Sequence, residues 1–294
     1  MSIEFAGLQF DNPVMNAACS AAKSHEDLDA ILATNAGAAL IGSITPKERS
    51  GNEEPRWFPG DGLPFALNSF GMPNGGCEWY QEHLLGMVEQ SHKAGKPFFL
   101  SVAGFGVADY VEMAKLAKES HVDVVEFNFG CPNTSEEGRP NPIFSFDPEI
   151  TEQICKEVEV VLEGLPYTIK LSPYSNPAEL ERMAAMIAKT KAVGVVTTNT
   201  FPQSYWQDEN GNPVLAPNDG FAGLSGEAML TIGLGQVKQF RKHLPEDKAV
   251  IGVGGITKAE HVAQYRHAGA LLVQVATHIV RNGHAAINEL IGAA

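Results

Sequence analysis

Eight short apolar segments alternate with longer amphipathic segments along this chain of 294 residues. Short runs rich in β-branched and aromatic residues are typical of buried strands, and the longer segments have the spacing of helices. Strands that alternate with helices form a parallel sheet, and eight such units favour a closed (β/α)8 TIM barrel over an open sheet. The predicted strands span residues 14–18, 38–44, 98–103, 122–129, 167–171, 193–198, 249–253 and 271–276.

The chain has room for one large domain. A barrel of this type needs about 250 residues, and no linker-like or low-complexity segment divides residues 1–294. We therefore expect a single barrel domain over 1–294. The helices have recognisable starts, because short polar residues cap a helix and proline suits its first position. The predicted caps are Ser24, Asp147 before Pro148, Asn176 before Pro177, and Thr257 in the capping box "TKAE".

Long connections follow the second, fourth and sixth predicted strands. Segments 46–76 and 200–226 are rich in Gly, Pro, Asn and Asp, and the fourth strand runs into the polar stretch "GCPNTSEEG". In a barrel, the segments after the strands lie at the C-terminal face, where active sites are built. We therefore expect these loops to form the walls and lid of a pocket, although long surface loops without a function are the simpler alternative.

Composition excludes several classes of function. The net charge of -14 opposes binding to nucleic acid and to anionic membranes. The N-terminus has no signal-peptide pattern, and no apolar run reaches the roughly 18 residues of a membrane span, so we expect a cytoplasmic protein. The four cysteines are scattered and the nine histidines form no cluster, which predicts a reduced compartment and no metal site.

A glycine-rich turn ends the seventh predicted strand. Gly254 and Gly255 stand directly before a helix, where bare backbone N–H groups can approach a phosphate; a tight structural turn explains these glycines equally well. Thr277 after the eighth strand and the turn at Gly226 add further donors of the kind that surrounds an anion. Together the three parts predict a phosphate site in the last βα loops.

A cysteine and four asparagines end or follow predicted strands. Cys131 lies between a glycine and a proline, which favours a turn that presents the thiol over an inert buried cysteine. A thiol has an ordinary pKa of about 8.5 and acts as a base toward a weakly acidic C–H if its thiolate is stabilised. Carboxamides both donate and accept hydrogen bonds, so a ring of them suits a planar ligand, although each alone is an ordinary turn residue. The asparagines are Asn68, Asn128, Asn133 and Asn199.

A lysine, Lys170, ends the fifth predicted strand between two apolar residues. A cation at the top of a barrel would lie beside a cofactor that becomes anionic, such as a reduced flavin. The alternative is a lysine whose long side chain reaches the surface. We interpret Lys170 as a site residue.

These residues stand in motifs that resemble the dihydroorotate dehydrogenase family. The sequence is similar to the soluble, fumarate-linked class 1A branch over nearly its whole length, as a divergent member. The resemblance implies a (β/α)8 barrel that binds FMN, oxidises dihydroorotate to orotate in pyrimidine biosynthesis, reduces fumarate and forms a homodimer. The matching motifs, in the family order, are "NPVMNAA", "GNEEPRW", "LNSFGMPN", "FNFGCPN", "IKLSPY", "VTTNT", "DGFAGLSG" and "VIGVGGI".

The resemblance also assigns roles to individual residues. Cys131 matches the base that removes the C5 proton of dihydroorotate while hydride leaves C6 for the flavin, and Lys170 matches the lysine beside the flavin ring. Residues expected to bind the substrate are Asn68, Gly71, Met72, Asn128, Asn133, Asn199 and Thr200. Residues expected to bind FMN are Ala17, Ala18, Lys23, Ser43, Asn128, Lys170, Gly226, Gly254, Gly255, Ala276 and Thr277.

Among several departures of this sequence from class 1A, the one at position 42 matters most. That branch carries a lysine where this chain has Gly42, whereas the membrane-linked class 2 branch places a lysine after the first strand, near Lys23. We therefore expect Lys23 to replace the missing charge. Other interpretations are an enzyme for another dihydropyrimidine, a tRNA-dihydrouridine synthase, which the charge of -14 opposes, and a flavin-binding protein without turnover.

Overall fold

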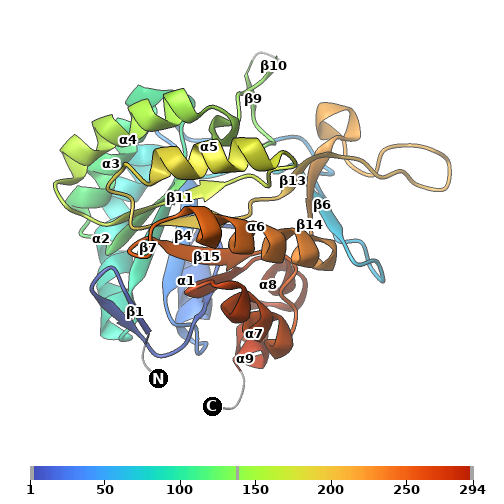
Figure 1. The fold of residues 1–294 in the computed structure, drawn as a ribbon. Coiled ribbons are helices and arrows are strands. Elements are labelled where there is room, and N and C mark those ends of the chain that lie inside the picture. Colours follow the sequence, from blue (N-terminus) through green and yellow to red (C-terminus); the bar gives the residue numbers. More distant parts are fainter. Residues whose placement is uncertain (1–2, 137–138, 292–294) are drawn as a thin grey trace.

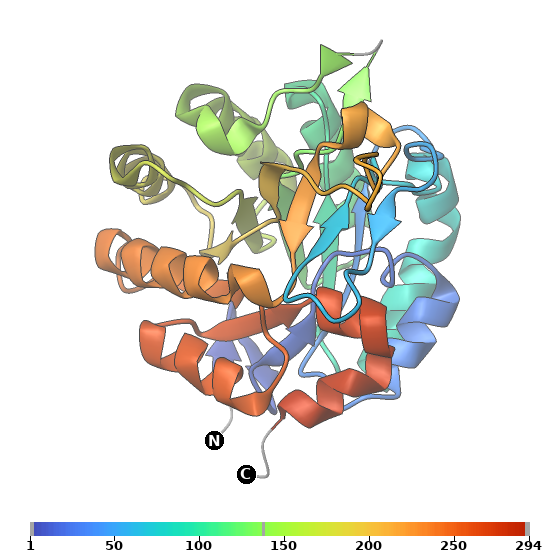
Figure 2. The same cartoon turned by 90° about the vertical axis from the view of Figure 1, so that its right-hand side faces the viewer.

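The computed structural model describes residues 3–136 and 139–291, and at its centre eight parallel strands form a barrel (Figures 1 and 2). Their hydrogen-bonded order is β3, β16, β15, β12, β11, β8, β7 and β4, so consecutive βα units are neighbours around the barrel. The prediction of eight parallel strands in a (β/α)8 barrel is therefore confirmed. The strands are β3 (Val14–Asn16), β4 (Ala39–Ile44), β7 (Phe98–Val102), β8 (Val124–Asn128), β11 (Tyr167–Leu171), β12 (Gly194–Thr197), β15 (Ala249–Val253) and β16 (Leu272–Val275).

A side chain joins β3 and β4, the two strands at the ends of that order. Asn16 is fully buried at the end of β3. Its carboxamide donates a hydrogen bond of 2.7 Å to the Leu40 carbonyl and accepts one of 3.0 Å from the Leu40 N–H. A carboxamide offers the same donor and acceptor as a peptide group, so Asn16 substitutes for a pair of ladder bonds and closes the barrel.

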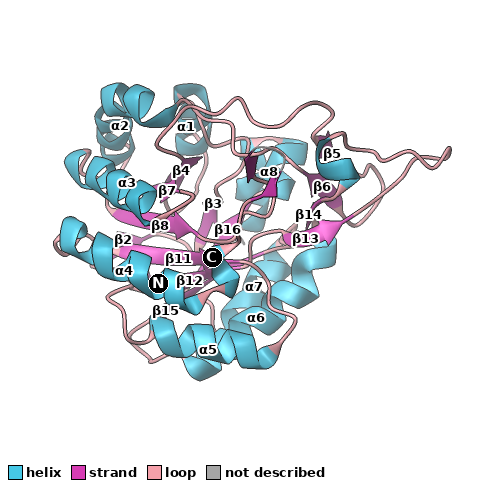
Figure 3. Ribbon diagram, turned by 90° about the horizontal axis from the view of Figure 1, so that it is seen from above, coloured by secondary structure: helices cyan, strands magenta, loops and turns pink. Residues whose placement is uncertain are grey.

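Helices surround the barrel on its outside (Figure 3). Each buries one face against the strands, as α4 does with Ile154, Val158 and Leu162 at helical spacing. The helices are α1 (His25–Leu32), α2 (Gly76–Lys93), α3 (Val107–Glu119), α4 (Pro148–Leu162), α5 (Pro177–Ile187), α6 (Leu230–His243), α7 (Ala259–Ala268), α8 (Thr277–Asn282) and α9 (Ile287–Leu290), with 3-10 turns η1 (Phe144–Phe146), η2 (Pro217–Gly220), η3 (Glu227–Met229) and η4 (His284–Ala286). None of the helices in the described ranges is long and apolar enough to cross a membrane.

Three of the four predicted helix caps are confirmed. The side chains of Ser24, Asp147 and Asn176 accept hydrogen bonds from the first turns of α1, α4 and α5. The capping box at Thr257 is wrong, because α7 begins at Ala259 with Lys258 as its cap and has no side-chain cap bond. The Thr257 hydroxyl instead donates to the Glu227 carboxylate at 2.8 Å, an acceptor from a different loop.

A four-stranded antiparallel sheet lies beside the mouth of the barrel (Figure 1). It combines β5 (Trp57–Phe58) and β6 (Ala66–Asn68), which follow the second barrel strand, with β13 (Phe201–Ser204) and β14 (Ala222–Ser225), which follow the sixth. Asn68 pairs with Gly223 on one side and with Trp57 on the other. Segments 46–76 and 200–226 therefore fold together, and they fix Asn68 above the barrel. The loop after β8 carries the short strands β9 (Ser135–Glu136) and β10 (Arg139–Pro140).

The opposite end of the barrel is closed by an N-terminal hairpin, β1 (Ile3–Phe5) with β2 (Leu8–Phe10). The ring of Phe99, from β7, lies 6.3 Å from that of Phe5 and 6.2 Å from that of Phe10. Apolar side chains from the other strands continue this cluster through the barrel interior. Because this end is filled with apolar groups, polar chemistry is confined to the end where the strands terminate.

Candidate active site

Two adjoining cavities open at the C-terminal ends of the barrel strands. The larger has a volume of about 520 Å³ and the smaller about 140 Å³. A pocket in the range of about 300–1,000 Å³ is typical of cofactor and ligand sites. Because they share part of their lining, the two cavities form one continuous site. The shared residues are Ala18, Lys170, Asn199, Thr200, Ser225, Ala276 and Thr277.

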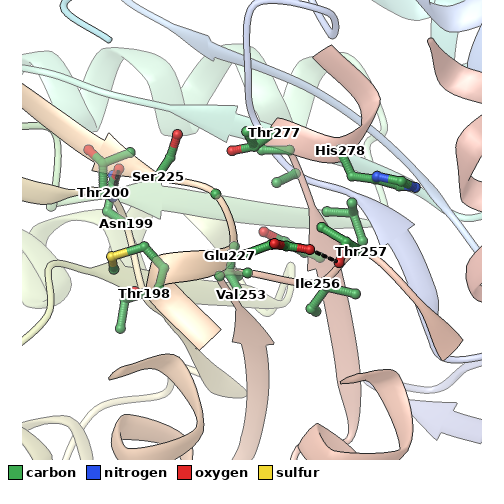
Figure 4. Close-up of a pocket in the computed structure, with 18 of the residues that line it drawn as sticks. Thr198, Asn199, Thr200, Ser225, Glu227, Val253, Ile256, Thr257, Thr277 and His278 are labelled. Carbon is green, nitrogen blue, oxygen red and sulfur yellow. Dashed lines mark hydrogen bonds between the residues drawn. The ribbon is translucent and has the colours of Figure 1, made fainter. Parts of the chain in front are cut away.

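The larger cavity is bounded by turns that bring bare backbone close to its interior (Figure 4). Gly255 has φ +73°, and a Cβ there would lie 2.4 Å from the Leu230 nitrogen, so only glycine fits. The predicted cofactor residues Ala17, Gly226, Gly254, Gly255, Ala276 and Thr277 all line this cavity. So do Lys258 and Arg281, two cations that sequence analysis missed. The arrangement suits an anion at this end of the site.

The smaller cavity brings together the predicted base and the predicted substrate residues. Its lining includes Cys131, Asn68, Gly71, Met72, Asn128, Asn133, Asn199 and Thr200, together with the predicted cofactor residues Lys23 and Ser43. These residues come from the ends of four barrel strands, β3, β4, β8 and β12, from the loops that follow them, and from β6. The barrel therefore brings together residues that lie more than 100 positions apart in the sequence, such as Lys23 and Thr200.

The four asparagines form two hydrogen-bonded pairs. The Asn133 amide donates to the side chain of Asn68 at 3.2 Å and to its backbone carbonyl at 2.8 Å. The Asn199 amide donates to the Asn128 carbonyl oxygen at 3.0 Å. A chain of bonds then continues from the Asn128 amide to the Ser43 hydroxyl at 2.9 Å. These bonds fix the orientation of each carboxamide before a ligand arrives, which limits the entropy lost on binding.

Cys131 lies in the wall of the smaller cavity as a free, partly exposed thiol. Burial raises the pKa of this thiol above its ordinary value. The backbone N–H of Asn133 and the positive charges of Lys23, Arg49 and Lys170 lower the pKa in opposition. Burial outweighs these groups, so the pKa stays above its ordinary value; the cations and the backbone donor reduce the cost of forming the thiolate, and a thiolate with a raised pKa is the stronger proton acceptor.

Lys23 supplies a cation beside Gly42. Its ammonium donates to the Ser43 carbonyl at 3.1 Å, and burial lowers its pKa to about 8. Gly42 has φ +119°, and a Cβ at this position would lie 2.1 Å from the Ser101 carbonyl oxygen. No side chain therefore fits at position 42 in this backbone, whereas the ammonium of Lys23 reaches the next residue from another loop.

Lys170 contacts a buried carboxylate, Glu126, which in turn binds Gln274, and sequence analysis missed both of these side chains. Its ammonium lies 3.5 Å from the Glu126 carboxylate, and both side chains are buried. Glu126 also accepts a hydrogen bond of 2.6 Å from the Gln274 amide. The available signal was an acidic residue within the apolar strand "VVEFN", two positions before Asn128 and so on the same face. In the described ranges, no group of three or more His, Cys, Asp or Glu residues could hold a metal ion.

Comparison with known proteins gives relatives along nearly the whole chain. The family described as "Dihydroorotate dehydrogenase" matches residues 1–293. The "Probable dihydroorotate dehydrogenase A (fumarate)" of Enterococcus faecalis is 33% identical over 96% of this chain and 89% of its own length. The "Dihydroorotate dehydrogenase A (fumarate)" of Lactococcus lactis subsp. cremoris is 31% identical over 99% and 92%. The "Dihydroorotate dehydrogenase (fumarate)" of Trypanosoma brucei brucei is 34% identical over 96% and 88%.

Proposed function

This chain belongs to the dihydroorotate dehydrogenase family, and on that premise we propose that it oxidises dihydroorotate to orotate in pyrimidine biosynthesis, with fumarate as electron acceptor. The names of its relatives support both the reaction and the acceptor. One observation carries the proposal for this chain: Cys131, four asparagines and two lysines line one small cavity that adjoins a larger one. This arrangement suits a base and a planar anionic ligand next to a cofactor.

The larger cavity fits FMN, the cofactor of this family. Buried polar atoms at its lining, Thr198 Oγ1 and Gln274 Oε1, have no hydrogen-bond partner among the described residues, which favours a polar ligand there. When bound, FMN accepts the hydride of dihydroorotate and passes two electrons on to fumarate. The residues that would hold it are Ala17, Ala18, Lys170, Gly226, Gly254, Gly255, Ala276 and Thr277 in the lining of the larger cavity, and Lys23, Ser43 and Asn128 in the lining of the adjoining smaller one.

Cys131 acts as the base in this proposal. Its thiolate takes the C5 proton of dihydroorotate while the C6 hydrogen leaves as hydride on the cofactor side. The cations around the thiol support this role because they favour the charged form of the sulfur. The side chains of Asn68, Asn128, Asn133 and Asn199 hold the imide and carboxylate of the ring, and Gly71, Met72 and Thr200 complete the pocket.

The two lysines have separate roles in this proposal. Lys170, which lines both cavities, presents positive charge to the cofactor ring. Lys23, which lines only the smaller cavity, supplies the charge that the class 1A branch draws from a lysine at position 42. The closed backbone at Gly42 and the 3.1 Å bond from Lys23 to the Ser43 carbonyl support this exchange.

The test is an anaerobic titration of the purified FMN-loaded protein with dihydroorotate. The visible flavin absorption is expected to bleach, and fumarate is expected to restore it. Bleaching by dihydrouracil but not by dihydroorotate would instead assign another dihydropyrimidine as substrate. Bleaching that requires tRNA would assign a dihydrouridine synthase, and a flavin that no dihydropyrimidine reduces would contradict turnover altogether.

We also propose that residues 1–294 act as one domain and pair as a homodimer in the cytoplasm. An aromatic cluster beside the antiparallel sheet supports pairing: Tyr205 and Phe221 lie 5.8 Å apart between ring centroids, and both are about 40% exposed. Trp206, which follows Tyr205 in the sequence, is also exposed. Light scattering is expected to give twice the chain mass, and a monomer at micromolar concentration would contradict the pairing.

A further inference from the structure

A buried polar triad separates the active-site cavities from the apolar interior of the barrel. Glu126 comes from β8, Lys170 from the neighbouring strand β11, and Gln274 from β16. Along the order of eight strands, β16 is four positions from β8, which is the opposite side of the barrel. The 2.6 Å bond from the Gln274 amide to Glu126 therefore crosses the barrel interior. The triad forms a floor under the site.

Glu126 lies one layer deeper than the lysine that it contacts. In the register of β8 and β11, Lys170 is level with Asn128, whereas Glu126 is level with Thr168. Lys170 and Gln274 line the larger cavity, and Glu126 lies behind them with no exposed surface. Below this layer, Val124 and Leu272 belong to the apolar cluster of the interior. Glu126 is therefore placed to act on a ligand through its two partners.

A buried carboxylate at this depth is costly for folding. Charges removed from water lose hydration, and a buried ion pair often stabilises a protein less than an apolar pair of the same size. The 3.5 Å separation from the Lys170 ammonium is also longer than a strong charge-assisted hydrogen bond. A contribution to stability therefore does not explain why Glu126 is an acid. A nearby cofactor whose charge changes on reduction would explain it.

We propose that Glu126 is a positioning residue for electron transfer: anchored by Gln274, its carboxylate holds the Lys170 ammonium at the cavity floor and offsets part of its charge. This inference rests on the proposed function, because it requires a redox cofactor in the larger cavity. A bare ammonium would favour the reduced, more negative cofactor strongly. A carboxylate behind the ammonium weakens that preference, so the reduced cofactor can still pass electrons to an acceptor.

The test measures the midpoint potential of bound FMN by equilibration with a reference dye, without dihydroorotate or fumarate. Glu126→Gln keeps the size of the side chain and removes its charge. It is expected to shift the balance between oxidised and reduced FMN at least tenfold toward the reduced form, which is about 30 mV for a two-electron couple. An unchanged or lower potential would overturn the inference.

Two controls separate the charge effect from a structural one. Thr168 is buried at the level of Glu126, and its hydroxyl has no hydrogen-bond partner among the described residues. Thr168→Val is therefore expected to leave the potential of bound FMN unchanged. In a Lys170→Met background, Glu126→Gln is expected to lose its effect, because Glu126 acts through the lysine. An equal shift in both backgrounds, or a similar shift in Thr168→Val, would contradict the proposal.

A second variant keeps the test open if Glu126→Gln does not retain FMN. Glu126→Asp keeps the negative charge but moves it away from Lys170 by the length of one methylene. The midpoint potential is therefore expected to rise, but by less than in Glu126→Gln. A potential that does not rise would contradict the inference. Failure of the proposed function is distinguishable. If dihydroorotate does not bleach the wild-type flavin, the assignment of substrate fails, whereas the shift in Glu126→Gln still supports the role of Glu126.

Discussion

The charge of Lys23 is expected to make the binding of an anionic ligand depend on pH above about 8. Burial lowers the pKa of Lys23 from 10.5 to about 8, and a carboxylate bound nearby raises it again because the opposite charge favours the ammonium. Orotate is therefore expected to bind with full affinity below pH 8. Above that value the free lysine must take up a proton on binding, so the affinity falls tenfold, or about 1.4 kcal/mol, for each pH unit.

The assay is a titration of orotate into FMN-loaded Cys131→Ala protein, followed by the change in flavin absorption between about pH 7 and pH 9.5. The alanine removes both turnover and the titration of the Cys131 thiol. In this background, Lys23→Arg keeps its charge at every pH and is expected to flatten the profile. Lys23→Met loses a charged hydrogen bond worth about 1.5–3 kcal/mol and is expected to bind orotate roughly 10- to 150-fold more weakly below pH 8.

Two results would refute this reasoning. One is an orotate affinity that stays constant through pH 9.5 while Lys23 is present. The other is a Lys23→Met protein that binds orotate as tightly as its parent at pH 7. Either result would show that the Lys23 ammonium does not face the ligand, and the charge missing at position 42 would then have no replacement from this loop.

Three further predictions concern the barrel and the base. Gly42→Ala is expected to lower the free energy of unfolding by about 3 kcal/mol or more, because a Cβ there would lie 2.1 Å from the Ser101 carbonyl oxygen. Urea unfolding measures this loss. Gly86→Ala is the matched control, because Gly86 lies on α2 with no atom near the position of an added Cβ. Asn16→Leu leaves the Leu40 N–H and carbonyl without their bonds to β3 and is expected to cost about 2–6 kcal/mol in the same assay. Cys131→Ala is expected to slow flavin reduction by dihydroorotate about 10²- to 10⁴-fold without loss of FMN, and the wild-type rate is expected to rise with pH up to the raised pKa of the thiol.

The barrel was predictable because its strands are buried on both sides. The strands "YTIKL" (β11) and "GVVT" (β12) are entirely buried. Most of their residues are apolar or β-branched, so each strand can be recognised in the sequence without knowledge of the strands that it pairs with. The barrel geometry then brings all strand ends to one face. That rule is enough to predict that Asn128, Cys131 and Asn199 meet, although it does not specify which carboxamide bonds to which.

The antiparallel sheet was not predictable from local pattern. Its strands are two to four residues long and lie in segments rich in turn-forming residues. The pairing of Asn68 with Gly223 joins positions 155 residues apart, so neither segment shows alone that it is extended. The prediction of a capping box at Thr257 was wrong for a related reason. The Thr257 hydroxyl donates a hydrogen bond to Glu227, which lies 30 residues earlier in the chain, and the local sequence pattern does not show this contact.

Two features of this site, Glu126 and Gly42, depend on contacts between strands that are distant in the sequence. Periodicity places Glu126 on the same strand face as Asn128, and hence inside the barrel, but only the register of eight strands brings Gln274 to it from the opposite wall. Likewise, the glycine at position 42 is visible in the sequence, but only the approach of β7 shows that the Ser101 carbonyl occupies the space of a side chain there. With that space closed, position 42 cannot carry a lysine in this backbone, and the ammonium of Lys23 lies 3.1 Å from the neighbouring Ser43 carbonyl. The packing of β4 against β7 thus supports the proposed exchange of one lysine position for another, and the pH dependence of orotate binding tests it directly.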